Sequence, residues 1–225
     1  MAIQIQGNAG TVAEVGGTTH RALRTERRSA DYGSLGFYRL SQQSGTMGVS
    51  IAGGAEIYQF RWTDATRLAA IYSIELSAGG NVAATTAVLA AFEAVIARSF
   101  TVAGTGGVAA TITGNNAKLR TSGMGTTLLG ESRVASTAAL GAGTKTLDTQ
   151  GIGCYAFGIG TAAITAAESL DLTPGVVQLF NAQGDHPIIL ATNEGFVIRT
   201  GVNAFPAGMT WTFGVNVAWA ELAAY

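Results

Sequence analysis

The stretch TWTFGVNVAWAEL, residues 210–222, indicates the fold class more clearly than any other part of the chain. Side chains of a β-strand point alternately to its two faces, so a period of two gathers one set of residues on one face. Large apolar residues alternate here with small or polar ones, and the apolar set is Trp211, Phe213, Val215, Val217 and Trp219. The pattern predicts a half-buried strand that turns an apolar face toward a core.

The residues before this strand continue the same kind of structure. PIILA (187–191) and FVIRTGV (196–202) have the apolar, β-branched composition of strands, and the turn signal NEG (193–195) separates them. AFPAGM (204–209) then predicts a loop. This part of the chain is therefore expected to form three strands joined by short connections.

Strand patterns also occur in the first half of the chain. EIYQFRW (56–62) places its three aromatic residues on one face, which predicts a half-buried strand. LAAIYSIEL (68–76) is rich in β-branched and aromatic residues, and GGN (79–81) predicts a turn after it. The stretch 83–102 is ambiguous because its alanines favour a helix, but the surrounding β pattern favours a strand over 90–102.

The middle of the chain is rich in turns. IGCYAFGIG (152–160) predicts an apolar strand, and LDLTPGVVQLF (170–180) alternates around a Pro-Gly turn at 174–175. Many short strands at close spacing are typical of a sandwich or a jelly roll, and no long helical pattern alternates with them. We expect an all-β, jelly-roll-like β-sandwich over residues 34–225, preceded by an extended N-terminal arm over residues 1–33.

The arm contains a basic segment, HRALRTERRSAD (20–31). We expect this arm to lie on a neighbouring subunit, where its arginines pair with carboxylates; a solvated terminus is the alternative. Acidic residues are mixed into the segment and the isoelectric point of the chain is near 6.1, so direct contact with nucleic acid is not expected. The arginines expected to make assembly contacts are Arg21, Arg24, Arg27 and Arg28.

The composition predicts an oligomer. Only 12% of the residues are charged, whereas about a quarter is usual in soluble proteins. Part of a surface with so few charges is expected to be covered by partner subunits, as in a dimer or a trimer. The start of the chain lacks the basic and apolar parts of a signal peptide, and no uninterrupted apolar run reaches about 18 residues. We therefore expect a soluble protein made in the cytoplasm, with no membrane contact.

Few residues are suited to catalysis or metal binding. His20 and His186 lie far apart, and a solvated turn explains the neighbouring Asp185 better than a site does. Cys154 is the only cysteine, which excludes an internal disulfide and any metal site with two thiolates; it is interpreted as a small buried residue. GAGTKT (141–146) lacks the spacing of a phosphate-binding loop. No enzyme activity, cofactor or metal is expected.

Three parts of the sequence carry a resemblance: the block ARSFTVAGTGGVAATITGNNAKLRTSGMGTTLLGESRVASTAALGAGTKTLD (97–148), the pattern NEGFVIRTGV…TWTFGVNVAWAEL (193–222) and the opening arm with VAEVGG…LRTERRSADYGSLGFYRL (12–40). All three resemble segments of structural proteins of tailed bacteriophages. The resemblance implies a virion component with a β-sandwich body. Its marks, besides turn glycines, are Arg98, Arg133, Trp219 and Glu221.

The resemblance leads to two expectations of function. The first is a capsid decoration or cement protein, which stabilises the shell through symmetric subunit contacts and its arm. Its partners would be copies of itself and the major capsid protein or another virion protein, and it would reside in the virion after assembly in the host cytoplasm. The alternative is a tail- or fibre-associated module that recognises a host-surface glycan or receptor. Trp62, Trp211 and Trp219 could stack on sugar rings, but their apolar strand faces favour a core role.

Overall fold

The computed structural model describes residues 35–48, 50–82, 84, 86–110, 130–161, 170–173, 175–182 and 186–223. These residues form strands and connections and no helix, so the expected all-β class is confirmed. The expected arm, with Arg21, Arg24, Arg27 and Arg28, lies outside the described residues.

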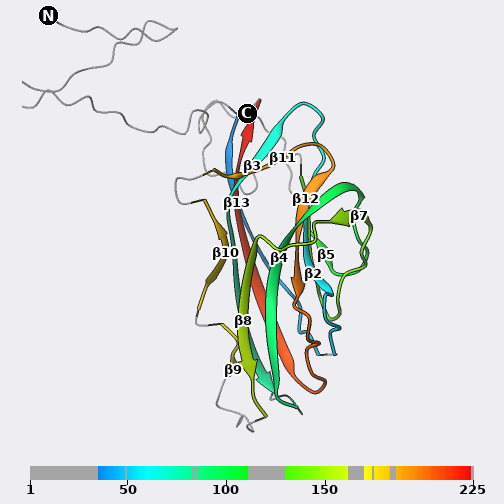
Figure 1. Cartoon of the computed structure of the whole chain (residues 1–225), viewed down its shortest axis with the longest axis vertical. Helices are drawn as coiled ribbons and strands as arrows, with labels where there is room; N and C mark the ends of the chain where they lie inside the picture. The colour runs from blue at the N-terminus through cyan, green and yellow to red at the C-terminus, as the bar shows by residue number, and fades with distance from the viewer. Residues whose placement is uncertain are drawn as a thin grey trace, which may run out of the picture. The chain divides into compact units, whose positions relative to one another are not determined.

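The described residues form strands of very different length, and β3, β4 and β13 are by far the longest (Figure 1). In chain order they are β1 (Phe37–Gln43), β2 (Glu56–Trp62), β3 (Leu68–Val82), β4 (Val88–Val102), β5 (Val108–Ala109), β6 (Gly130–Val134), β7 (Thr144–Leu147), β8 (Gly153–Ile159), β9 (Leu170–Asp171), β10 (Val177–Asn181), β11 (Ile188–Leu190), β12 (Glu194–Thr200) and β13 (Thr210–Leu222).

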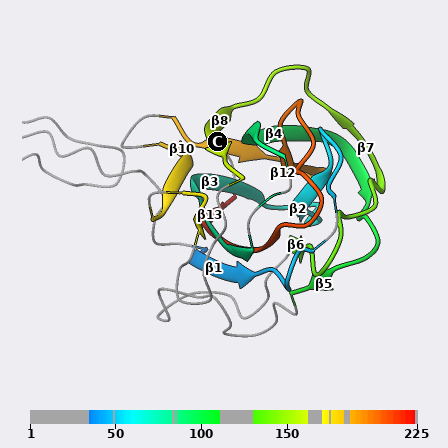
Figure 2. The ribbon, with the colours of Figure 1, turned by 90° about the horizontal axis from the view of Figure 1, so that it is seen from below.

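Two antiparallel sheets face each other, as the view along the strands shows (Figure 2). The first sheet has the order β1-β13-β3-β10, with β9 and β11 also paired to β3. The second has the order β5-β6-β2-β12-β4-β7, with β8 also paired to β4. All described pairings are antiparallel.

The strand order is that of a jelly roll. When β5, β6, β7, β9 and β11 are set aside, eight of the thirteen strands remain. Numbered one to eight along the chain, they follow the order 1-8-3-6 in the first sheet and 2-7-4-5 in the second. The first and last strands thus lie side by side, and the chain crosses between sheets as in two Greek keys. The jelly-roll-like sandwich expected from the sequence is confirmed.

The core between the sheets is strongly aromatic. The apolar face predicted for residues 210–222 is buried, and β13 has those bounds. Trp211 stacks on Phe205 with the ring centroids 4.7 Å apart, and Trp219 contacts Phe60 of the opposite sheet at 5.4 Å. The tryptophans therefore serve the core, as their place on apolar strand faces indicated.

The predicted turn at 79–81 is wrong, because β3 continues to Val82. The cause is its pairing with β13, a long strand whose Thr212 and Trp211 lie opposite Gly79 and Gly80. A Cβ atom on Gly80 would lie 2.8 Å from the carbonyl oxygen of Thr210, so glycine permits close approach here instead of a turn. The turn predicted at 193–195 is confirmed only at its start: the chain turns at 192–193, where Asn193 has a φ of 61°, and Glu194 and Gly195 already belong to β12.

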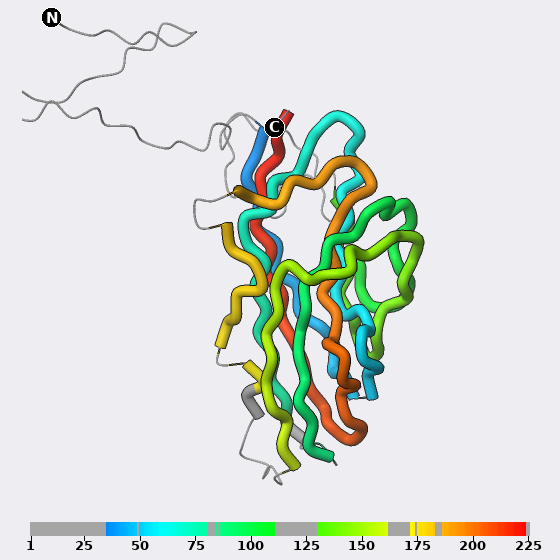
Figure 3. The backbone as a smooth tube through the Cα atoms, in the orientation of Figure 1, coloured from blue at the N-terminus to red at the C-terminus, as the bar shows by residue number. Residues whose placement is uncertain are grey.

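The second sheet is also covered on part of its outer face. Ser99, with a φ of 49°, interrupts the alternation of β4 and turns Phe100 outward. A second, small core then forms outside the sheet from Val95, Ala97, Phe100 and Val197, with Leu147 of β7 packed against it. The cover comes from the described residues between β4 and β8, which include β7 and run beside the sheet in the tube view (Figure 3). The strand predicted at 56–62 is consequently buried on both faces, not on one.

Candidate functional site

Two strongly exposed apolar side chains lie beside each other at the outer side of the second sheet. Leu89 at the start of β4 is 75% exposed, and Val202 after β12 is 93% exposed. The two lie close together, because Asn203 Nδ2 donates a 2.7 Å hydrogen bond to the carbonyl oxygen of Leu89. Isolated exposed apolar residues are common, but a contiguous apolar patch marks an interaction site.

The register of the strands shows what surrounds these two side chains. Gly158 and Ala156 of β8 lie opposite Leu89 and Ala91 of β4, and the Gly201 amide donates to the Ala91 carbonyl at 2.7 Å. Small side chains thus predominate on this part of β4 and β8, beside the residues that follow β12. We call this surface the Leu89 face and define it by five residues: Leu89, Ala91, Ala156, Gly158 and Val202.

A polar boundary limits the Leu89 face. Arg199 of β12 pairs with Glu93 of β4 at 3.0 Å. Cys154 lies next to Glu93 in the β8 register and is exposed, so its interpretation as a buried residue is wrong. The cause is that β8 turns Tyr155 and Phe157 toward the core and Cys154 outward. Partial burial, followed by the charge of Glu93, raises the pKa of the Cys154 thiol.

Beyond this boundary, a buried ion pair holds the covering segment on the sheet. Lys145 Nζ of β7 lies 2.8 Å from Glu56 Oε2 of β2, and the two side chains are 2% and 9% exposed. The same ammonium group lies 4.7 Å from the centre of the Phe100 ring. Gln59 donates to Glu56 at 2.5 Å and to the Gly141 carbonyl at 2.8 Å, so the neighbouring loops are tied to the same network.

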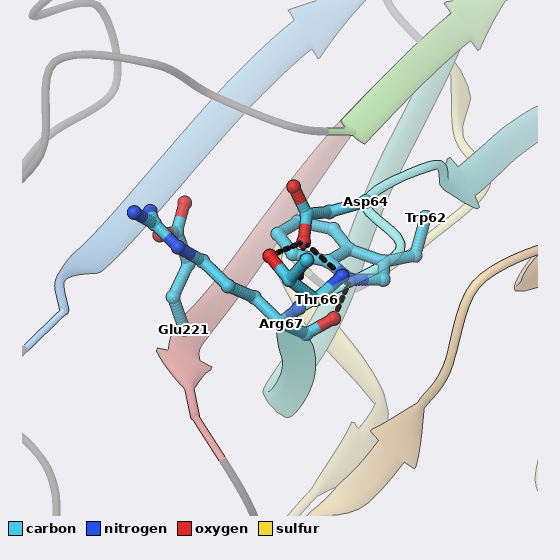
Figure 4. A network of polar contacts seen from close by, with 5 residues as sticks. All are labelled: Trp62, Asp64, Thr66, Arg67 and Glu221. Atoms are coloured by element: carbon cyan, nitrogen blue, oxygen red, sulfur yellow. Dashed lines mark hydrogen bonds and ion pairs between the residues drawn. The ribbon is translucent and has the colours of Figure 1, made fainter.

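A second network joins β13 to the connection between β2 and β3 (Figure 4). Arg67 Nη1 lies 2.8 Å from Glu221 Oε2, although the Glu221 side chain is fully buried. The Arg67 carbonyl accepts a 2.7 Å hydrogen bond from the Trp62 indole, and its amide donates to Asp64 at 2.6 Å. The Thr66 amide also donates to Asp64, at 2.7 Å. Asp64 thus shapes the connection that directs Arg67 toward β13.

In this network, burial and hydrogen bonding shift the pKa values of the two carboxyl groups, Glu221 and Asp64, in opposite directions. Burial raises the pKa of Glu221 above its ordinary value, even though Arg67 acts in the opposite direction. Burial, with the nearby Glu221 carboxylate, raises the pKa of Tyr38 to about 12. For Asp64, hydrogen bonds from Thr66 and Arg67 outweigh partial burial and lower the pKa. The buried atoms Tyr38 Oη, Trp219 Nε1 and Glu221 Oε1 make no hydrogen bond of ordinary geometry.

Residues that mark the phage resemblance have structural contacts. Arg98 pairs with Glu194 at 2.8 Å and Asp148 at 3.3 Å, and its hydrogen bonds to these carboxylates raise its pKa. Arg133 donates to the Gly106 carbonyl at 2.7 Å. Trp219 and Glu221 belong to the core and to the network with Arg67. None of the expected assembly arginines lies within the described residues, and the Leu89 face was missed because its residues carry no sequence motif.

The described residues bring together little that could do chemistry. They contain no group of three or more His, Cys, Asp or Glu residues placed to hold a metal ion. A shallow groove of about 400 Å³ is lined by Arg61 and Arg133, but Arg61 is already paired with Glu131 at 2.9 Å. Of the histidines, His186 contacts the neighbouring Pro187 carbonyl at 2.6 Å, while His20 lies outside the described residues. The expectation of a non-enzymatic protein stays a prediction.

Within the described part of the chain, no helix is long and apolar enough to cross a membrane. Neither a family model nor a curated protein matches this sequence.

Proposed function

We propose that the chain is a structural protein of a virus particle, a jelly-roll subunit that decorates a phage capsid and binds the shell through its Leu89 face. The observation that carries the proposal is the pair of exposed apolar side chains, Leu89 and Val202, beside the small residues Ala91, Ala156 and Gly158. Water contact with this surface is unfavourable, and burial against a partner removes it.

The form of the face favours a shell protein as the partner. Ala91, Ala156 and Gly158 have small side chains, so another backbone can approach closely. A protein surface can therefore bury these residues by direct contact. Contacts of this kind are weak singly, but a subunit that repeats over a symmetric shell gains affinity from many of them. The low charge of the chain fits the same role, because fewer charged groups have to be desolvated at each contact.

The glycan-binding alternative has less support. Sugar-binding modules of this kind use exposed aromatic rings, whereas Trp62, Trp211 and Trp219 are at most 2% exposed. These three residues are all the tryptophans of the chain. An array of glycans probed with the purified protein is expected to give no specific signal.

Co-sedimentation with virus particles tests the proposal. The probe is the particle of the phage whose genome encodes the chain, prepared without this protein. The wild-type chain is expected to sediment with these particles up to a fixed number of copies, and Leu89→Lys and Val202→Lys are expected to weaken binding at least about tenfold, because each buries an unpaired charge.

The matched control is Val176→Lys, which exchanges another exposed valine before β10 of the first sheet. It is expected to bind as the wild type does. Absence of binding by the wild-type chain would contradict the proposed function. Equal binding by all four proteins would leave a capsid role in place but remove the Leu89 face from it.

A further inference from the structure

Strand β1 (Phe37–Gln43) is an edge of the first sheet. It pairs with β13 on one side only, and no described strand pairs with its other side. An edge strand presents its unpaired amides and carbonyls as a template for another strand.

The pairing with β13 shows which groups of β1 point outward. The Glu221 amide donates to the Gly36 carbonyl at 2.9 Å, and the Ser44 amide donates to the Phe213 carbonyl at 2.9 Å. In an antiparallel pair, hydrogen-bonded positions alternate with positions whose backbone groups point away. The even-numbered residues of β1 therefore bond to β13, and the amides and carbonyls of Arg39, Ser41 and Gln43 face the open edge.

This edge lacks the usual protection against pairing. Its register with β13 has no bulge, and it contains no proline. Its one charged residue, Arg39, is already paired with Glu75 at 2.8 Å. Of the other edges in the described part of the chain, β5 has two residues, β7 and β10 pair with bulges, and β8 pairs without a bulge but contains two glycines, which weaken a strand.

The sequence of β1 is suited to pairing with a second copy of itself. If Ser41 lies on a two-fold axis, Ser41 faces Ser41 of the second copy, and Arg39 faces its Gln43. All these positions have outward-pointing backbone groups, so each facing pair exchanges hydrogen bonds. A shift that placed Arg39 opposite a second Arg39 would oppose like charges. A groove of about 390 Å³ lies beside this part of β1, with Ser41, Gln43 and Thr212 among its lining residues.

We infer that the protein forms a symmetric dimer in which the β1 strands of two copies pair antiparallel around Ser41. The first sheets of the two copies join into one continuous sheet. The inference goes beyond the proposed function and concerns the free protein, so it holds or fails without any virus particle. The edge of the first sheet and the Leu89 face of the second sheet are separate, so a dimer still has both faces available for a shell.

Sedimentation equilibrium of the full chain over a range of micromolar concentrations tests this inference. The wild-type chain is expected to be in equilibrium between monomer and dimer. The affinity of the dimer is expected to be moderate, because a single strand pairing buries less area than a standard interface of about 1,600 Å². Ser41→Pro removes an amide that points away from β13, so β1 keeps its own pairing. The loss of two symmetric hydrogen bonds is expected to raise the dissociation constant at least about tenfold.

Two substitutions at one exposed position test the register without a proline. Gln43→Glu places a carboxylate opposite Arg39 of the second copy and is expected to tighten the dimer about threefold. Gln43→Lys places a like charge there and is expected to weaken it by a similar factor. Thermal unfolding of each variant checks that the fold is kept. A monomeric or trimeric wild-type chain overturns the inference, and so does a dimer whose affinity none of these three substitutions changes.

Discussion

Arg67, just before β3, holds the fully buried carboxylate of Glu221, near the end of β13, with Nη1 and Oε2 2.8 Å apart. The ion pair offsets the free-energy cost of burying the charged carboxylate in the core. The arginine is 31% exposed, so water reaches one partner and not the other. The two residues therefore contribute unequally to stability.

Replacing Arg67 by methionine is expected to cost more stability than replacing Glu221 by glutamine. Arg67→Met leaves a buried carboxylate unpaired and is expected to lower the free energy of unfolding by about 2 kcal/mol or more at pH 7. Glu221→Gln removes the charge itself and is expected to cost less. Urea denaturation measures both, and the double variant should recover part of the loss caused by Arg67→Met. A larger loss for Glu221→Gln would contradict this account.

The same pair gives a pH dependence. The pKa of Glu221 is raised in the folded protein, so the folded state holds this proton more tightly than the unfolded chain does. The stability that Glu221 contributes is fully present below its unfolded pKa and is lost as the pH rises through its folded pKa. The penalty of Arg67→Met is therefore expected to shrink when the pH is lowered from neutral into this range. Denaturation of Glu221→Gln over the same pH range provides the reference.

The buried pair of Lys145 and Glu56 is expected to be worth more than an exposed pair. Lys145→Met leaves Glu56 buried without its cation and is expected to lower the free energy of unfolding by about 3 kcal/mol. Arg39→Met breaks a pair whose arginine is 47% exposed, and it is expected to cost less than about 1 kcal/mol. Chemical denaturation compares the two variants, and equal losses would refute the buried role of Lys145.

Two glycines of β8 are expected to respond differently to a methyl group. A Cβ atom on Gly153 would lie 1.6 Å from the Leu179 carbonyl oxygen, so Gly153→Ala must separate β8 from β10. A loss of about 2 kcal/mol or more is expected. On Gly158 the Cβ atom would lie 4.0 Å from Leu89 Cδ2, which is an ordinary contact, so Gly158→Ala is expected to be nearly neutral. The midpoint of thermal unfolding distinguishes them.

The thiol of Cys154 is expected to react while the protein is folded. The residue is exposed, but its pKa is raised, so the thiolate fraction at neutral pH is small. Alkylation by iodoacetamide should reach one group per chain without denaturant and should accelerate as the pH rises above 8. Mass spectrometry counts the modification, and Cys154→Ser is the blank. A thiol that reacts only in urea would show that the residue is buried.

The sequence allowed prediction of what depends on local period. The alternation over 210–222 identified β13 and its core face, because each apolar residue there falls on one side of the strand. The strand at 90–102 was found in spite of its alanines, and β4 has the bounds Val88–Val102. The close spacing of many short strands was sufficient to predict a β-sandwich.

What the sequence did not allow depends on contacts between distant segments. Gln59 was expected on the exposed face of its strand. Its side chain instead accepts a hydrogen bond from the Gly104 amide and donates one to the Gly141 carbonyl, and both glycines lie far along the chain. Cys154 stands in a run that is apolar or small on both faces, so the period did not show which face is outside. The Leu89 face combines residues of β4 and β8 with Val202, and only the folded chain brings them together.

The alkylation rate of Cys154 on the virus particle tests the central claim most directly. Cys154 is the only cysteine of the chain and lies at the boundary of the Leu89 face, so it reports contact there without any substitution. If this face binds the shell, the rate should fall at least about tenfold when the protein is bound to particles. An unchanged rate in protein shown to be bound would contradict the account.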